Sequence, residues 1–493
     1  MLEGLEYSTM KVENIDVTEA IENARKQIAE DRSLSPAMRS TFDLLVLIIS
    51  LLVNRLGINS SNSSKPPSQD PNRDKNKDKK KRKPRKDKGI KRKPGAQPGH
   101  KGVTLEKSEH PDEIEEIKID LRSIPSGDYE DVGYDSRQVF DVEIKMNIKE
   151  YRAQILENKK TGQQYVAVFP DDVSKAVQYG NEVRAQAVYM SIFQMIPLAR
   201  ILDYFKEQAG LLVSKGSISN FKRFAYKKLE EIGFKAWVSV QLFSSEVCHA
   251  DETGINVNGK RIWLHGLCNE KYTIYHPDLK RGKDAMDRMG ILEKYEGVLC
   301  HDHWKPYYKF ENCTHSLCNA HHLRELTRAH EQDDQRWALN MHDLLEEINE
   351  AVKASENGVL IEDEIKSYQK RYRTILTKGK KEYPLPDKIP GKKGKQKKSK
   401  ARNLLERLID YEDDTLRFMK EAAVPFTNNQ GENDLRMTKV QQKVSGCFRS
   451  MDGAEEFCLI RSYIVTARKH GMGASQALRI LFRGDRPDFM KLS

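Results

Sequence analysis

Cysteine is absent from the first half of the chain, and the seven cysteines that it contains begin at Cys248. An odd number of cysteines, none of them near the N-terminus, does not suit the disulfide framework of a small secreted protein. The pattern favours a chain that is kept in a reducing cytosol.

A long hydrophobic run is also missing. The longest apolar stretch, residues 44–53, is interrupted by Ser50 and is too short to cross a bilayer. It begins too far from the N-terminus for a signal peptide and lacks the small-residue cleavage site. We therefore expect no membrane partner, and 493 residues are enough for two to four domains.

Positive charge is concentrated in two segments. The net charge is +11, yet residues 73–101 contain 15 Lys or Arg against three Asp, so the rest of the chain is slightly acidic. Residues 378–402 contain 11 basic residues against two acidic ones. Flexible basic segments bind polyanions by phosphate contact and counterion release, although a merely solubilising linker has the same composition.

The N-terminal half divides into four segments by pattern. Helical spacing of apolar residues predicts a helical self-association region over 1–57, and Ser, Pro, Gly and like charges predict a disordered basic linker over 58–102. Weak alternation, as at 138–145 and 165–169, predicts a small β-rich module over 103–175.

The fourth segment, 176–240, is predicted to be helical and to resemble a helix-turn-helix. Its second helix has a possible cap at Ser217 and carries basic residues that would bind DNA, namely Lys222, Arg223 and Lys227. A helical hairpin that never touches DNA is the alternative.

Strand patterns return over 241–330. We expect a strand that ends at Asp251, an Asn258-Gly259 hairpin turn, and strands at 261–267 and 272–275. A helix over 282–289 and a fourth strand that ends at Asp302 follow, then a helix from Trp304. Three antiparallel strands, a helix and a fourth strand form the opening order of a ribonuclease H-like fold.

Three acidic residues in these settings are candidate metal ligands. Asp251 and Asp302 end strand-like runs, and Glu432 lies in a polar segment that has the pattern of a helix. Carboxylates that converge hold hard cations such as Mg²⁺ or Mn²⁺, and two such ions stabilise the attacking and the leaving oxygen of a phosphodiester. Considered alone, each of these acids has an alternative interpretation as a solvated turn residue without a catalytic role.

Five motifs, in order along most of the chain, resemble the insertion sequence 66 family of bacterial transposases, within the DDE superfamily. They are NSSNSSKPPS (59–68), PGAQPGH (94–100), DETG (251–254), CNAH (318–321) with LREL (323–326), and PFTNNQ (425–430) running into Glu432, Leu435 and Arg436. The resemblance implies that Asp251, Asp302 and Glu432 are the catalytic residues and the ligands of two Mg²⁺ or Mn²⁺ ions. It also implies a multidomain α/β protein whose ribonuclease H-like core, 241–330 and 425–493, is interrupted by a helical insertion with a basic loop, 331–424.

Two departures from the family pattern concern zinc and the last acid. Family members carry paired Cys-x-x-Cys zinc ligands after the basic linker, whereas residues 103–175 contain no cysteine, so we do not expect zinc there. Gly431 and Asn433 flank Glu432 where Ala and Arg are expected, and the missing positive charge weakens an expected phosphate contact.

The segment 313–322 is rich in possible zinc ligands: Cys313, His315, Cys318, His321 and His322. Structural zinc is one interpretation. We favour another, in which His321 lies near the catalytic carboxylates and touches phosphate or orients a ligand. The remaining residues expected to contact DNA are Trp304, Lys305, Arg324 and Arg436, with ordinary packing at a helix start as the alternative for Trp304 and Lys305.

The residues and the resemblance together predict a cytoplasmic, nucleoid-associated bacterial transposase. It would bind double-stranded DNA, both the terminal inverted repeats and the target, as a homo-oligomer, with accessory transposition proteins as further candidate partners. Cutting and joining would proceed by two-metal phosphoryl transfer. Two alternatives stay open: a ribonuclease H-like, structure-selective nuclease that cuts without joining, and a non-catalytic DNA-binding derivative of a transposase.

Deletion of residues 73–93 tests the role of the basic linker, because it removes 14 basic residues and three Asp. Affinity should fall for specific and random DNA alike, and the slope of log affinity against log salt should fall by about 0.9 for each DNA phosphate that the protein no longer neutralises. Fluorescence anisotropy at several salt concentrations measures both quantities. If the deletion abolishes discrimination between element ends and random DNA and leaves the salt slope unchanged, the prediction is wrong.

Overall fold

The structure is a computed structural model that describes residues 11–12, 15–31, 33–56, 105–384 and 398–491. The described residues fall into two units. The first comprises those up to Leu56, 153–206 and those from Leu212 onward, and the second comprises 105–152 and 207–211. The predicted basic linker, 58–102, lies outside the described residues, and so does the middle of the predicted basic loop.

The N-terminal segment is helical, as predicted. A short pair of strands, β1 (Lys11–Val12) and β2 (Ile15–Asp16), precedes helices α1 (Val17–Glu30) and α2 (Pro36–Leu56), which pack on each other. In α2 the side chain of Val46 is buried, whereas eight large apolar side chains are exposed: Met38, Phe42, Leu44, Leu45, Leu47, Ile48, Ile49 and Leu52. The described residues therefore do not provide the burial that the apolar pattern of α2 predicts.

The prediction of a β-rich module over 103–175 is largely wrong. The strands of residues 105–175 are β3 (Ile155–Glu157) and β4 (Gln164–Val166), an antiparallel pair, with a 3₁₀ turn η2 (Leu121–Ser123) before them. Residues 138–145 form no strand, and Val139 and Val142 are almost fully exposed. Among the residues that the structure describes, the alternating side chains meet no partner strand or packing layer, and without these an alternating pattern does not hold a strand.

Residues 181–243 are helical. The elements are α4 (Asn181–Val188), the π-helix η3 (Tyr189–Phe193), α5 (Leu198–Ala209), α6 (Lys215–Glu231) and α7 (Phe234–Phe243). The cap of α6 is Ser214 and not Ser217, because Ser214 Oγ accepts the N–H of Ser217 at 3.0 Å. One face of α6 packs against α4, α15 (Met451–Lys469) and α16 (Ala474–Arg483).

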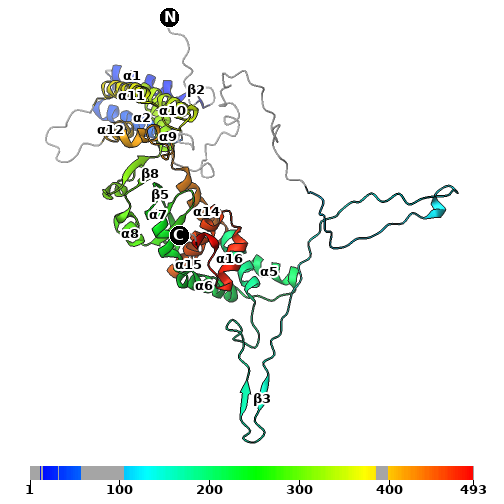
Figure 1. Cartoon of the computed structure of the whole chain (residues 1–493). Helices are drawn as coiled ribbons and strands as arrows, with labels where there is room; N and C mark the ends of the chain where they lie inside the picture. The colour runs from blue at the N-terminus through cyan, green and yellow to red at the C-terminus, as the bar shows by residue number, and fades with distance from the viewer. Residues whose placement is uncertain (1–10, 13–14, 32, 57–104, 385–397, 492–493) are drawn as a thin grey trace. The chain divides into compact units, whose positions relative to one another are not determined.

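A five-stranded sheet of order β7-β6-β5-β8-β9 follows (Figure 1). β5 (Val247–Val257), β6 (Lys260–Cys268) and β7 (Thr273–Asp278) form an antiparallel meander, and β8 (Val298–His301) and β9 (Thr314–Leu317) run parallel to β5. The φ angles of Asn258 and Gly259 are +49° and +78°, as the predicted Asn-Gly hairpin turn requires. α8 (Lys283–Met289) and the 3₁₀ turn η4 (Leu292–Lys294) join β7 to β8.

Helices cover the sheet and extend beyond it. α14 (Asn429–Ser445) packs on β5 and β6, and α15 packs on β7. α9 (Asn319–Asp333), α10 (Arg336–Ala354), α11 (Glu362–Glu382) and α12 (Lys400–Asp410) form a bundle (Figure 1). The side chain of Trp337 is buried in the core of this bundle.

The predicted helical insertion over 331–424 is therefore helical in its described part. The remaining short elements are η5 (Lys305–Lys309), α13 (Glu412–Leu416), η6 (Arg417–Met419) and η7 (Asp488–Met490). Among the described residues, no helix is both long and apolar enough to cross a membrane.

Candidate active site

Asp251 lies inside a strand and not at its end, so the prediction of a turn after it is wrong. β5 continues to Val257 because β6 pairs with it along the whole polar DETG segment, from His249 to Val257. On its other edge β5 pairs with β8 at residues 247–249 alone. Asp251 therefore stands where β5 has just separated from β8.

Asp302 directly follows β8, as predicted. The parallel register pairs His249 with Cys300, two residues before Asp251 and Asp302, and the charge of Asp302 raises the pKa of Asp251. Asp302 Oδ1 accepts the N–H of Trp304 at 2.9 Å. The predicted helix from Trp304 is a short 3₁₀ turn, η5.

Glu432 lies in the first turn of α14, which confirms the predicted helix. Its carboxylate faces α9: Oε1 is 3.7 Å from His321 Nδ1 and 3.9 Å from Cys318 Sγ, and Oε2 is 3.9 Å from Arg324 Nη2. The side chain of Glu432 is 31% exposed, so a substrate can reach it.

Asn428, a member of the PFTNNQ motif for which no role was predicted, joins α14 to β5 beside Asp251. Its Nδ2 donates to the Ala250 carbonyl at 2.8 Å, its Oδ1 lies 2.8 Å from His249 Nδ1, and its N–H points at Cys318 Sγ at 3.1 Å. Asn428 is only 2% exposed. A Cβ at Gly431 would lie 3.2 Å from the Asn428 amide, so the unexpected glycine leaves room for these bonds.

Further contacts hold α14 against the sheet. Asp434 accepts hydrogen bonds from Thr273 of β7 at 2.8 Å and from Lys469 of α15 at 2.7 Å. Leu435 packs on Gly266, the β6 residue that pairs with Asp251. A Cβ added at Gly266 would lie 3.0 Å from the side chain of Leu435. The helix that carries Glu432 is thereby fixed relative to Asp251.

The three carboxylates share one electrostatic environment. Burial raises the pKa of Asp251 well above its ordinary value, and the charges of Glu252, Asp302 and Glu432 raise it further. Among the described residues, one donor reaches the Asp251 carboxylate, the N–H of Glu252 at 2.9 Å. Asp251, with a single donor to its carboxylate and two further acids that act on it, offers hard oxygen ligands that fit a divalent cation such as Mg²⁺ or Mn²⁺.

Glu252, the second residue of the DETG motif, had no predicted role, and its carboxylate is paired. Arg281 Nε donates to Glu252 Oε1 at 3.0 Å, and Tyr307 Oη donates to Oε2 at 2.6 Å. Burial and Asp302 raise the pKa of Glu252, whereas Tyr307 and Arg281 lower it. The Arg281 guanidinium is sandwiched between the indoles of Trp263 and Trp304, at 4.6 and 4.2 Å from the ring centroids.

The residues expected to bind DNA lie in different settings. Lys227, Lys305 and Arg436 are exposed. Arg223 is paired with Glu456 at 3.3 Å, and burial lowers the pKa of Lys222 while Glu456 raises it. Trp304 has Arg281 on its ring, and His321 and Arg324 lie beside Glu432.

The cysteines and histidines of 313–322 do not form one cluster. Cys313 donates to the Phe310 carbonyl, and the buried His322 hydrogen-bonds Asn319 Oδ1 at 3.0 Å. Cys318 and His321 turn instead to Glu432. All seven cysteines are free thiols.

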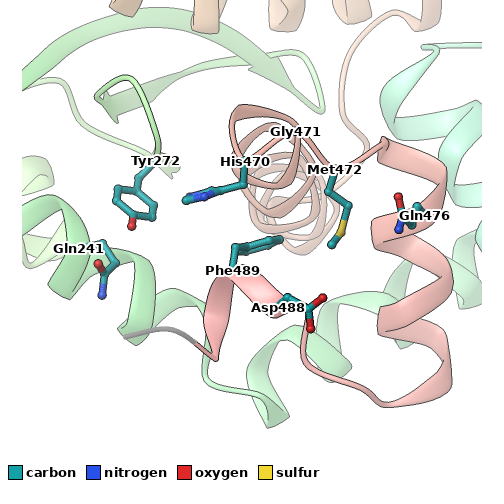
Figure 2. Close-up of a pocket in the computed structure, with 8 residues that line it drawn as sticks. All are labelled: Gln241, Tyr272, His470, Gly471, Met472, Gln476, Asp488 and Phe489. Atoms are coloured by element: carbon teal, nitrogen blue, oxygen red, sulfur yellow. The ribbon is translucent and has the colours of Figure 1, made fainter.

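A separate pocket is lined by few groups that could take part in catalysis (Figure 2). Its lining includes Tyr272, His470 and Phe489, with the His470 and Phe489 rings stacked at 5.1 Å, and none of the three carboxylates takes part. Its one acidic residue, Asp488, is paired with Lys491 at 2.9 Å.

These features define a mixed α/β protein with three electrostatically interacting carboxylates, one on β5, one directly after β8 and one in the first turn of α14. The family model described as Transposase IS66 family matches residues 176–456, more than half of the chain. The chain therefore belongs to the IS66 family of transposases, which implies a transposase role and the use of DNA. A second model, a family of unknown function (DUF6444), matches residues 13–106, and no curated protein matches the chain.

Asn428→Ala should destabilise the protein by about 1–3 kcal/mol, because it leaves the buried Ala250 carbonyl and His249 ring without partners. Asn433→Ala, an exposed asparagine on the same helix, is the matched control and should change stability by less than about 0.5 kcal/mol. Denaturant unfolding of both variants measures the difference. Equal stabilities would show that the Asn428 bonds do not hold α14.

Proposed function

We propose that this protein is a DDE-type transposase that cuts the ends of an insertion sequence and joins them to target DNA. What supports the proposal is that the charges of Asp302 and Glu432 act on Asp251 in a chain of the IS66 family. The sheet order β7-β6-β5-β8-β9, an antiparallel meander followed by two parallel strands, supports a ribonuclease H-like core.

Asp251, Asp302 and Glu432 are the residues that would hold Mg²⁺ or Mn²⁺. Such ions, when bound, supply an activated attacking oxygen and neutralise the leaving oxygen of the phosphodiester. Asn428 keeps Glu432 in register with Asp251 through its bonds to β5. Arg324 and His321 orient the Glu432 carboxylate from α9, and Arg324 carries a positive charge toward an incoming phosphate.

DNA binding is proposed to rest on exposed basic side chains at the site and on the helical region 176–240. Lys305 follows Asp302, and Arg436 follows Glu432 by one helical turn, so both flank the carboxylates. On α6, Lys227 is exposed, whereas Arg223 must exchange Glu456 for a phosphate. The sequence-specific part of the proposal, a helix-turn-helix formed by α5 and α6, is supported by the turn between the two helices and the basic residues on α6.

A homo-oligomer is proposed from α2, whose eight exposed apolar side chains suit association with another helix. Pairing of two copies would bring two element ends together.

The alternative function, a nuclease, would use the same three carboxylates. It would lack the second step, in which the cut ends are joined to target DNA. A strand-transfer assay with the element's own ends separates the two functions, because a transposase yields joined products and a nuclease stops at cut ends.

Asp251→Asn or Asp302→Asn should lower the rate of end cleavage roughly a thousandfold or more, about 4 kcal/mol of barrier, while end binding stays nearly intact. The amide keeps the size of the side chain and loses the charge that holds the cation. Gel assays of cleavage and binding measure both effects. Asp284→Asn, which removes an exposed carboxylate of α8, is the control, and wild-type cleavage by either test variant would refute the assignment.

Divalent cations should stabilise the protein more at neutral pH than in mild acid. The raised pKa of Asp251 means that its ionisation opposes folding, by an amount that grows as pH rises from the ordinary 3.8 through the raised value. A bound cation offsets this penalty, by up to about 2.7 kcal/mol at a hundredfold excess over its dissociation constant. The rise in melting temperature on adding Mg²⁺, followed by scanning fluorimetry, should thus increase with pH and shrink in Asp251→Asn. A rise independent of pH and of Asp251 would contradict the prediction.

A further inference from the structure

We propose that Cys318, His321 and Glu432 form a reversible binding site for a thiophilic divalent cation, Zn²⁺ in particular, which draws Glu432 away from Asp251 and Asp302 and so inhibits the enzyme. The binding site itself stands on the geometry alone. The inhibitory role rests on the proposed function.

The three ligand atoms are already gathered. Cys318 Sγ, His321 Nδ1 and a Glu432 oxygen lie within 4.8 Å of one another, with Sγ to Oε1 at 3.9 Å and Nδ1 to Oε1 at 3.7 Å. Tetrahedral zinc with ordinary bond lengths separates such ligand pairs by about 3.4–3.6 Å. Movements of a few tenths of an ångström bring Glu432 Oε1 to these distances from Sγ and Nδ1, and the Sγ–Nδ1 pair, within 4.8 Å, closes by at most about 1.2 Å.

His321 has a free ligand atom that is aimed into the site. Its Nδ1 is shielded from solvent and has no hydrogen-bond partner among the described residues. An orphaned buried ring nitrogen is costly, and a metal ion is one of the partners that relieves the cost.

Backbone N–H groups favour negative charge on the Cys318 sulfur, although burial outweighs them. Cys318 is the N-cap of the 15-residue helix α9, and the N–H of Asn428 points at Sγ at 3.1 Å. Burial raises the pKa of the Cys318 thiol to about 11, so the resting site holds a thiol. When the metal–sulfur bond forms, the thiol proton leaves to solvent, and the sulfur binds as thiolate.

The ligands are held in position without a metal. The N–H of Cys318 donates to the His301 carbonyl at 3.0 Å, and the N–H of Asn319 donates to the Phe426 carbonyl at 3.1 Å. The site is therefore not needed for folding. Arg324, 3.9 Å from Glu432 Oε2, repels a cation, which makes the binding weaker than at a structural zinc site.

The ligand types separate this site from the catalytic one. Thiolate and imidazole suit zinc and not magnesium, whereas Asp251 and Asp302 offer oxygen alone. Because Glu432 is common to both sets, the two sites compete for one carboxylate.

Cobalt(II), a spectroscopic substitute for zinc, tests the binding site directly. The full chain, reduced, freed of metal and carrying Cys447→Ser to remove the exposed thiol, should show a thiolate-to-cobalt charge-transfer band that zinc abolishes. The band should disappear in Cys318→Ser and persist in the matched control Cys313→Ser. His321→Gln, a second variant in case Cys318→Ser does not fold, should weaken cobalt binding at least roughly tenfold. Absence of the band, or its survival in Cys318→Ser, overturns the proposal.

Zinc inhibition of Mg²⁺-dependent end cleavage tests the regulatory part. Zinc should inhibit the wild type and Cys313→Ser, a chelator should restore both, and Cys318→Ser should resist zinc relative to its own zinc-free rate. Equal inhibition of all three proteins overturns the regulatory role. If no protein cleaves DNA in the absence of zinc, the proposed function fails while the cobalt result stands by itself.

Discussion

The attachment of α14 to β5 is the constraint on which the acidic site depends. Asp251 and Asp302 are brought together by the parallel pairing of two neighbouring strands, but Glu432 arrives from a helix 130 residues further along the chain. Asn428 bonds that helix to the backbone next to Asp251, and Gly431 and Gly266 allow the close approach. Larger residues in place of these two glycines would hinder the close approach of α14 to β5 and β6. The carboxylate of Glu432 would then lose its fixed position relative to Asp251 and Asp302.

A second consequence of this attachment is electrostatic. Two adjacent acids of β5 differ in their partners. Glu252 accepts hydrogen bonds from Arg281 and Tyr307. Asp251 lies near Asp302 and Glu432 and has one backbone donor among the described residues. Placing Asp251 near two further acids in a partly buried position opposes folding, and the arrangement persists because the surrounding packing enforces it. This uncompensated charge is what distinguishes a cation site from a structural ion-pair network.

The sequence predicted the elements better than the contacts between them. The position of Asp302 after a strand, that of Glu432 on a helix and the Asn-Gly turn follow from local pattern, because each depends on neighbours in sequence. The course of β5 through DETG does not, since pairing with β6 overrides the turn-like composition. The prediction of a strand at residues 138–145 is wrong for the opposite reason, because an alternating segment without a pairing partner does not form a strand. Asn428 lies in the PFTNNQ motif, but neither its role nor that of Arg281 could be predicted locally, since both roles arise only when distant segments meet.

Iron-directed cleavage of the protein backbone tests the central claim, that these three segments surround one cation site, most directly. Fe²⁺ exchanged for Mg²⁺ generates hydroxyl radicals in the presence of ascorbate and peroxide, and these cut the chain next to the bound ion. Simultaneous cuts near Asp251, Asp302 and Glu432, all suppressed by excess Mg²⁺, are the predicted result. Cuts at one of the three positions alone, or cuts elsewhere that Mg²⁺ suppresses equally, would contradict the claim.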